Sequence, residues 1–176
     1  ETTAAAELQN YIAQISGKTL PLTTDAAQPA AHEILVGKTN REGERSFTVD
    51  RASLGDEGFT VKTVGEKLVI AGGELRGTLY GVYNFLEQQL GCRWFTPSVS
   101  VIPDSTTVQI DATLDYSQKP VFEYRYQDWN CTLDENWRVK QKINEGADYT
   151  EFGGTLFYAN GCHTEKFDKP CCCEAV

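Results

Sequence analysis

The sequence has no methionine, only two histidines and no long apolar run, and these absences exclude several classes of protein. No segment approaches the ~18 consecutive apolar residues that a membrane-spanning helix requires, so we expect no membrane span. Basic residues are also few, 16 against 25 acidic ones, which gives a net charge of −9. A chain of this charge repels phosphate backbones, and nucleic acid is therefore not an expected partner.

The six cysteines do not have the spacing of a disulfide framework. Three stand alone and the other three, Cys171–Cys173, are consecutive, and adjacent cysteines rarely bridge one another without strain. No Cys-x-x-Cys pair is present to bind zinc, although Cys162, His163 and the consecutive cysteines leave a loose zinc cluster open as a weaker alternative. We expect free or partly oxidised thiols, no metal and no cofactor.

The missing methionine also bears on the start of the chain. Glu1 is not a translational start unless an initiator was removed, so we expect a segment upstream of it. A cleaved export signal would explain its loss, as would simple shortening of the chain. The export signal predicts a secreted, periplasmic or cell-surface location.

Two segments have the apolar spacing of amphipathic helices. The first, Ala4–Ile15, has Thr3 to cap its start and Gly17 to end it in a left-handed conformation. The second is Arg76–Leu90, which is also followed by a glycine. The apolar positions are Leu8, Tyr11, Ile12 and Ile15 in the first, and Leu79, Val82, Tyr83, Leu86 and Leu90 in the second.

Strands are predicted between and after these helices. Residues 33–37 form a short apolar run typical of a buried central strand. Residues 58–64 and 67–72 are separated by two turn residues, which predicts a hairpin. Shorter strand candidates are residues 19–22, 99–102 and 106–110.

Glycines surround the start of the second helix. Gly77 and Gly81 each destabilise a helix by about 1 kcal/mol relative to alanine, so we expect a neighbouring strand to approach the backbone closely there. The preceding Gly72–Gly73 pair is compatible with a phosphate-binding loop, but its spacing fits neither common nucleotide fingerprint and a tight turn is favoured. Arg76 opposes the helix dipole, so a carboxylate partner such as Glu74 is expected.

Beyond residue 114 the composition changes. Residues 115–120 are polar and end in proline, as a linker does. A strand over residues 121–126, a helix over 134–145 and a further strand near 155–158 follow. This alternation predicts the start of a β/α domain, but these residues are too few for a barrel, which typically needs about 250.

The segment Gly72–Phe95, with its Gly-Gly-Glu-Leu-Arg-Gly-Thr-Leu-Tyr-Gly start and its Gly-Cys-Arg-Trp-Phe end, resembles a known family. It is similar to the N-terminal domain that precedes the catalytic barrel in family 20 β-hexosaminidases, in family 67 α-glucuronidases and, most closely, in the domain of unknown function 4838, found chiefly in gut Bacteroidetes. Ala5–Gly17, Ile34–Gly37 and Asp56–Phe59 follow the same pattern in the same order.

The resemblance implies an α+β fold, a mixed β-sheet with helices packed on one face, followed by a (β/α)8 barrel. We therefore expect an accessory domain over residues 1–114, and a linker with the truncated beginning of a barrel over residues 115–176. That barrel would be the intramolecular partner of the accessory domain, and a glycan or oligosaccharide would be the partner of the full-length protein.

The resemblance also implies where a sugar would bind. Residues 120–125 are similar to the first barrel strand of these enzymes, in which the arginine, here Arg125, reaches the sugar. Asp128 and Trp129 would lie at or just beyond the end of that strand, and His163 at the edge of the second strand. The alternative for the first three residues is a structural Arg–Asp ion pair beside a core tryptophan. We expect no catalytic residue here, because no segment matches the Asp-Glu pair of the hexosaminidases.

The leading hypothesis is a non-catalytic accessory domain of a secreted glycoside hydrolase-like protein, with no activity of this chain alone. A carbohydrate-binding or protein-docking module without hydrolase activity is the alternative. A redox or metal protein built on the cysteine-rich end is a third and weaker one.

Overall fold

The computed structural model describes residues 1–43, 46–127 and 129–144. The chain forms two compact units, Glu1–Val121 and Phe122–Val176. The predicted strand near residues 155–158 lies outside the described residues.

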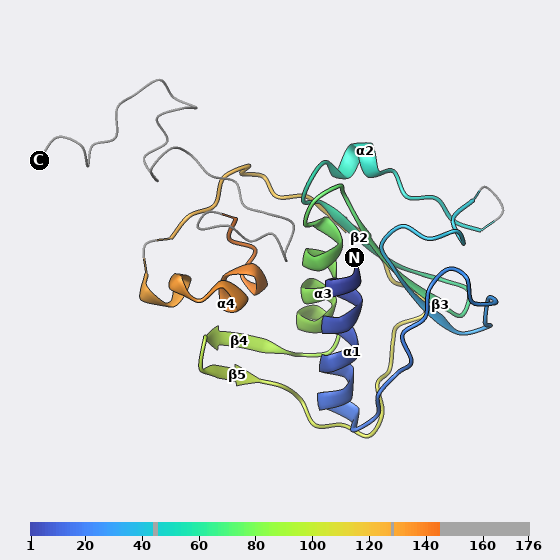
Figure 1. The fold of residues 1–176 in the computed structure, drawn as a ribbon, viewed down its shortest axis with the longest axis horizontal. Helices are drawn as coiled ribbons and strands as arrows, with labels where there is room; N and C mark the ends of the chain where they lie inside the picture. Colours follow the sequence, from blue (N-terminus) through green and yellow to red (C-terminus); the bar gives the residue numbers. More distant parts are fainter. Residues whose placement is uncertain (44–45, 128, 145–176) are drawn as a thin grey trace, which may run out of the picture. The chain divides into compact units, whose positions relative to one another are not determined.

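A four-stranded mixed sheet is the framework of the first unit (Figure 1). Its strand order is β1-β3-β2-β6, with β1 parallel to β3 and the other pairs antiparallel. The strands are β1 (Glu33–Val36), β2 (Phe59–Val64), β3 (Lys67–Gly72) and β6 (Asp115–Gln118). The predicted β2–β3 hairpin is confirmed, and its turn contains Gly65 at φ 60°.

Two features of this sheet differ from the sequence predictions. Strand β1 lies at an edge of the sheet rather than at its centre, because its only sheet neighbour among the described residues is β3. Asp115–Gln118 was predicted as part of a linker but pairs with β2 as β6. The residues of this strand are polar and mostly exposed, so they lack the apolar pattern from which a strand is predicted. The first unit therefore extends to Val121 rather than ending at residue 114.

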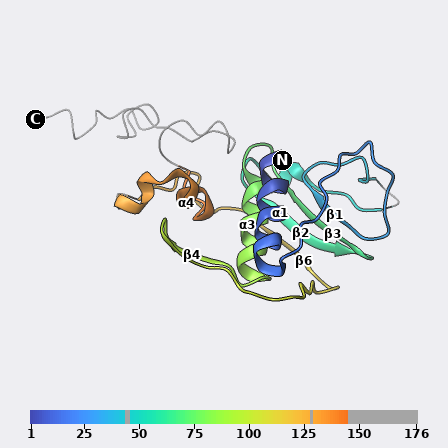
Figure 2. The same cartoon turned by 60° about the horizontal axis from the view of Figure 1, so that its bottom comes forward.

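Two helices cover one face of the sheet, as Figures 1 and 2 both show. Helix α3 (Gly77–Gln88) packs on β2 and β3, and α1 (Thr2–Ser16) packs on α3. Val61 and Ile70 are cross-strand partners on this face and are fully buried. Gly81 lies against this face, since an added Cβ would be 3.0 Å from Ile70 Cγ2. The predicted close approach of a strand to the helix is thus confirmed.

Loop residues cover the other face of the sheet. Leu35, Val69 and Ala71 form a buried cluster there with Phe47, and Val49 packs against it. The short helix α2 (Arg51–Leu54) follows this loop, and the carboxylate of its N-cap Asp50 accepts a hydrogen bond from the Ser53 amide. Both faces of the sheet are therefore covered, one by helices and one by a loop.

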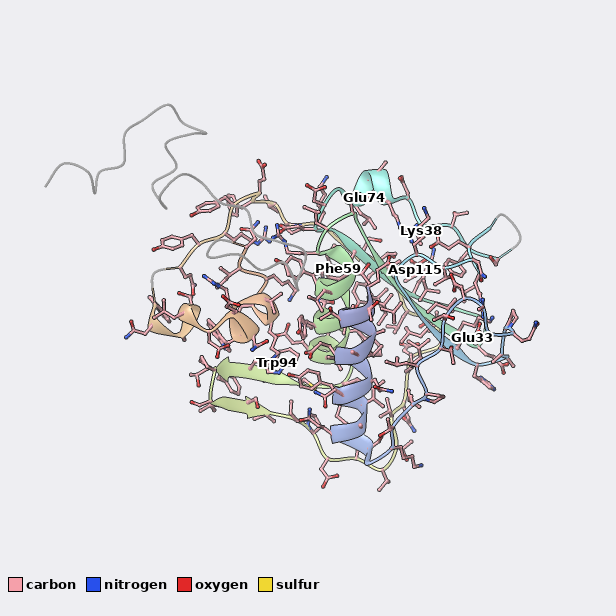
Figure 3. The ribbon with its side chains drawn as sticks, viewed as in Figure 1. Glu33, Lys38, Phe59, Glu74, Trp94 and Asp115 are labelled. Carbon is pink, nitrogen blue, oxygen red and sulfur yellow. The ribbon has the colours of Figure 1, made fainter. Side chains whose placement is uncertain are left out.

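Helix α1 ends as predicted but starts differently. Gly17 adopts a left-handed conformation at its C-terminus, at φ 70°. The N-cap is Glu1 rather than a capping Thr3, and no side chain caps the helix there. The helix is attached to the rest of the unit through Trp94, labelled in Figure 3, whose indole donates a 3.0 Å hydrogen bond to the Tyr11 hydroxyl. Burial raises the pKa of that Tyr11 hydroxyl to about 12.

A two-stranded hairpin, β4 (Arg93–Thr96) and β5 (Val99–Val101), follows α3. It confirms the strand predicted near residue 99. The strands predicted at residues 19–22 and 106–110 are wrong, because both segments are irregular.

In the second unit a 3₁₀ helix, η1 (Asn130–Leu133), leads into α4 (Glu135–Lys140). The carboxylate of Asp134 caps α4 by accepting a 2.7 Å hydrogen bond from the Trp137 amide. The predicted helix over 134–145 is confirmed in part, but the described residues of segment 121–126 do not form the predicted strand. The beginning of a barrel is therefore not shown. None of the described helices is long and apolar enough to cross a membrane.

We predict that Gly73→Ala destabilises the first unit by about 3 kcal/mol, because the new Cβ would stand 1.5 Å from the carbonyl oxygen of Gly55. Urea denaturation measures the difference. Gly43→Ala is the matched control, since an added Cβ there has nothing within 4 Å. Equal stabilities of the two variants would contradict the close packing of these loops.

Candidate functional site

Arg125, the first of the predicted sugar-binding residues, is held by backbone carbonyls of its own unit. Its Nε donates a 2.6 Å hydrogen bond to the carbonyl of Lys142, and its Nη1 donates a 2.8 Å bond to the carbonyl of Phe122. These bonds fix the guanidinium in one orientation. The planar guanidinium is therefore held in a defined position.

Asn144 supports the same arginine through the backbone. It is only 2% exposed, and its carboxamide accepts a 2.8 Å hydrogen bond from the Arg125 amide while donating a 2.6 Å bond to the Glu123 carbonyl. Its own amide donates to the Arg125 carbonyl at 3.3 Å. Asn144 thus gives the backbone of residues 123–125 the hydrogen-bond partners that a neighbouring strand would otherwise supply. Sequence reasoning missed it, because an isolated asparagine gives no signal of burial.

Trp129, the next predicted residue, is 70% exposed. Its carbonyl accepts hydrogen bonds from the amide and the hydroxyl of Thr132, which position it at the start of η1. Trp129 is therefore not a core residue among the described ones, whereas the Arg–Asp pair of the alternative interpretation involves Asp128, which lies outside them. Tyr124 and Tyr126, with stacked rings 6.4 Å apart, belong to the same unit. Phe122 is also exposed, so this unit presents aromatic surface to solvent.

The other two predicted site residues, Asp128 and His163, lie outside the described residues. The structure therefore brings neither of them to Arg125 nor separates them from it. The zinc alternative falls largely on the same part of the chain, since Cys162 and Cys171–Cys173 are also outside it. Within the described part, no group of three or more His, Cys, Asp or Glu side chains could hold a metal ion.

The two described cysteines, Cys92 and Cys131, are free thiols. Cys92 is fully buried, and burial raises the pKa of its thiol to about 11. A thiol of this kind is almost entirely protonated at neutral pH and is a poor nucleophile. Cys92 is therefore a core residue, not a reactive one.

The glycine-rich turn before α3 is not a phosphate site. The amides of Leu75, Arg76 and Gly77 all point at the carbonyl of Asp56, at 3.1, 3.2 and 3.3 Å, so they are occupied within the fold. Phosphate-binding loops need such amides to be open to the ligand. The preferred interpretation, a tight turn, agrees with this geometry.

Arg76 has a carboxylate partner, but not the expected Glu74. Its Nε and Nη2 both lie 2.7 Å from Oε1 of Glu57, and both side chains are buried. The partner comes from the segment before β2, so the pair links that segment to the start of α3. Sequence proximity suggested Glu74, whereas folding brings Glu57 closer.

A separate pocket of about 360 Å³ lies in the first unit. At its side the carboxylate of Glu33, labelled in Figure 3, accepts hydrogen bonds from Lys67 at 2.6 Å and from Arg41 at 3.2 Å. The hydrogen bond from Lys67, followed by those from the Ala30 amide and Arg41, lowers the pKa of Glu33 to about 2. Sequence reasoning did not single out this group, whose members are distant along the chain. The pocket is lined by Pro29, Asn40, Arg41, Ser46, Phe47, Val64 and Lys67.

We predict that the stabilising effect of Glu33 is lost at acid pH. Its pKa is about 2 in the folded protein against an ordinary value of 4.5, so its contribution is full above about pH 4.5 and is lost as the pH falls through 2. Thermal unfolding of the wild type and of Glu33→Gln should therefore differ most above pH 4.5 and converge toward pH 2.

The control for this experiment is Glu66→Gln, because Glu66 is exposed and its carboxylate lies 3.9 Å from Nε2 of His32, which is also exposed. It should follow the wild type at every pH. A Glu33→Gln difference that is constant from pH 6 to pH 2 would contradict the assigned pKa.

Two family models match the chain. Residues 1–85 match the model described as the glycosyl hydrolase family 67 N-terminus, and residues 94–169 match the domain of unknown function DUF4838. The resemblance stated from the sequence is thereby confirmed for both families. Arg125, Asp128, Trp129 and His163 all fall within the second match. No curated protein matches the sequence.

Among solved structures, the chain is similar to a family GH115 4-O-methyl-α-glucuronidase with specificity for decorated arabinogalactans. The two are 19% identical with a TM-score of 0.46, and the match covers 70% of this chain. The chain spans only 16% of that enzyme.

Proposed function

Because this chain is related to the N-terminal domains of glycoside hydrolases, we propose that it is the non-catalytic accessory part of a secreted, glycan-processing protein. The observation that carries this proposal is the family 67 N-terminal match, which falls on the sheet-and-helix unit. In this proposal residues 1–121 are the accessory domain, and the residues after them begin a barrel that belongs to the full-length protein. A secreted, periplasmic or cell-surface location is part of the proposal.

The state of the described carboxylates supports a non-catalytic role. Glycoside hydrolysis commonly uses two facing carboxyl groups, of which one has a raised pKa and protonates the leaving oxygen. The described carboxyl groups with a shifted pKa, Glu33, Glu42 and Asp111, are all shifted downward by hydrogen bonds. Glu57 is held in a buried ion pair. The first three groups therefore do not have the raised pKa of a catalytic acid, and Glu57 serves as the ion-pair partner of Arg76.

We further propose that Arg125, Asp128, Trp129 and His163 contact the glycan. The guanidinium of Arg125 is held in place by its own unit, and the exposed indole of Trp129 can stack on the C–H face of a pyranose ring. Trp129 is 70% exposed, so its indole is accessible to a ligand.

We predict that the chain binds glycans on an array without hydrolysing them. Trp129→Ala should weaken binding about tenfold or more, since stacking on an exposed ring is lost. Chromatography of the incubated glycans should show no cleavage products.

Phe122→Ala is the matched control, because Phe122 is an aromatic side chain of similar exposure in the same unit. It should bind as the wild type does. Release of sugar by the chain would contradict the non-catalytic role, and an array without any binding by the full-length protein would contradict the proposal as a whole.

A further inference from the structure

The pocket beside Glu33 is partly open to solvent and large enough for a small ligand. Its volume of about 360 Å³ is at the lower end of the ~300–1,000 Å³ range of small-molecule sites. Phe47, Val64 and Pro29 supply apolar surface, and polar side chains supply the rest of the lining. A site of this size and composition suits one ring with both a C–H face and polar substituents.

Hydrogen-bond donors remain available in the lining. Among the described residues, the ammonium of Lys67 has Glu33 as its only partner, and its side chain is 27% exposed, so two of its three N–H groups are available. Asn40 uses one amide N–H for the Asp25 carbonyl, and its second N–H has no partner in the described part of the chain. Both donors can serve the hydroxyl oxygens of a ligand.

The balanced charge of the pocket does not favour an anion. Arg41 and Lys67 carry two positive charges, which Glu33 and Asp25 balance at 2.6 to 3.8 Å. Arg41 also donates to the carbonyls of Asp25 and Ala27, so its Nη groups are occupied by the fold. With no excess positive charge to stabilise a carboxylate or phosphate, a neutral ligand with hydroxyl groups fits best.

We propose that this pocket is a second sugar site, one that binds a neutral monosaccharide unit of a glycan. The C–H face of the ring packs on Pro29 and Val64, and its hydroxyl groups accept hydrogen bonds from Lys67 and Asn40. The choice of a sugar rests on the proposed function, but the site belongs to the accessory unit and uses none of the residues proposed in the second unit.

An NMR titration of the 176-residue chain tests this site. Methyl galactoside, methyl glucoside and methyl arabinoside are added to ¹⁵N-labelled protein, and the affinity expected for a single sugar is about millimolar. At least one of these sugars should shift the amide signals of Asn40 and Lys67. Glucuronate should bind more weakly than the best neutral sugar.

Two variants probe the pocket from different sides. Lys67→Met removes the ammonium and keeps the length of the side chain, so binding should weaken about tenfold, which corresponds to 1.4 kcal/mol. Pro29→Trp adds bulk to the lining of the pocket without removing an N–H donor and should abolish binding. Lys18→Met is the matched control, because Lys18 is exposed and does not line the pocket. It should bind as the wild type does.

The results separate this proposal from the sugar site in the second unit. Shifts at Asn40 and Lys67 that persist in Trp129→Ala support the pocket, whether or not the second unit binds sugar. Shifts confined to residues 122–144 and lost in Trp129→Ala would overturn the pocket while leaving the proposed function intact. Stronger binding of glucuronate, or unchanged binding by Lys67→Met and Pro29→Trp with native unfolding curves, would also overturn it.

Discussion

The first unit depends on the contact between the segment before β2 and the turn before α3. Three successive amides, those of Leu75 to Gly77, converge on the carbonyl of Asp56. The Gly73 amide donates to the carbonyl of Gly58 at 2.9 Å, and the buried Glu57–Arg76 pair lies at the same junction. Removing one member of a buried ion pair typically destabilises a protein by 3–5 kcal/mol.

This contact explains why the turn needs glycine. An added Cβ at Gly73 or Gly77 would stand 1.5 or 2.1 Å from a backbone oxygen of the facing segment. Backbone oxygens do not move aside as flexible side chains do, so only glycine allows the two segments to meet. The result is that α3 starts directly on the sheet and places its buried side chains against β2 and β3. The glycine motif that first suggested the family therefore has a structural role.

The elements with a strong apolar period could be predicted from the sequence. The two helices, the hairpin and the close approach at Gly81 all follow from spacing or glycine placement within a short stretch. Strand β6 could not be predicted in this way, because its exposed polar residues are defined by their pairing with β2 more than fifty positions earlier. The partner of Arg76 was missed for the same reason, since Glu57 is 19 residues away.

The candidate sites show the same limit. Family resemblance suggested Arg125 and Trp129 as sugar-binding residues, but it gave no indication of Asn144, whose role depends entirely on where the chain returns after α4. The pocket beside Glu33 could not be predicted for a similar reason, because Pro29, Arg41 and Lys67 meet only in the folded unit. Short-range patterns thus identify elements, whereas sites assembled from distant segments require the fold.

The central claim, that residues 1–121 form a self-contained accessory domain completed by β6, is tested most directly by comparing the fragments 1–121 and 1–114. Trp94 is the only tryptophan in either fragment, so its fluorescence reports on the core contact with Tyr11. Fragment 1–121 should unfold in one cooperative thermal transition, and fragment 1–114, which lacks β6, should be clearly less stable. Absence of a transition in fragment 1–121, or equal stability of the two fragments, would contradict the account.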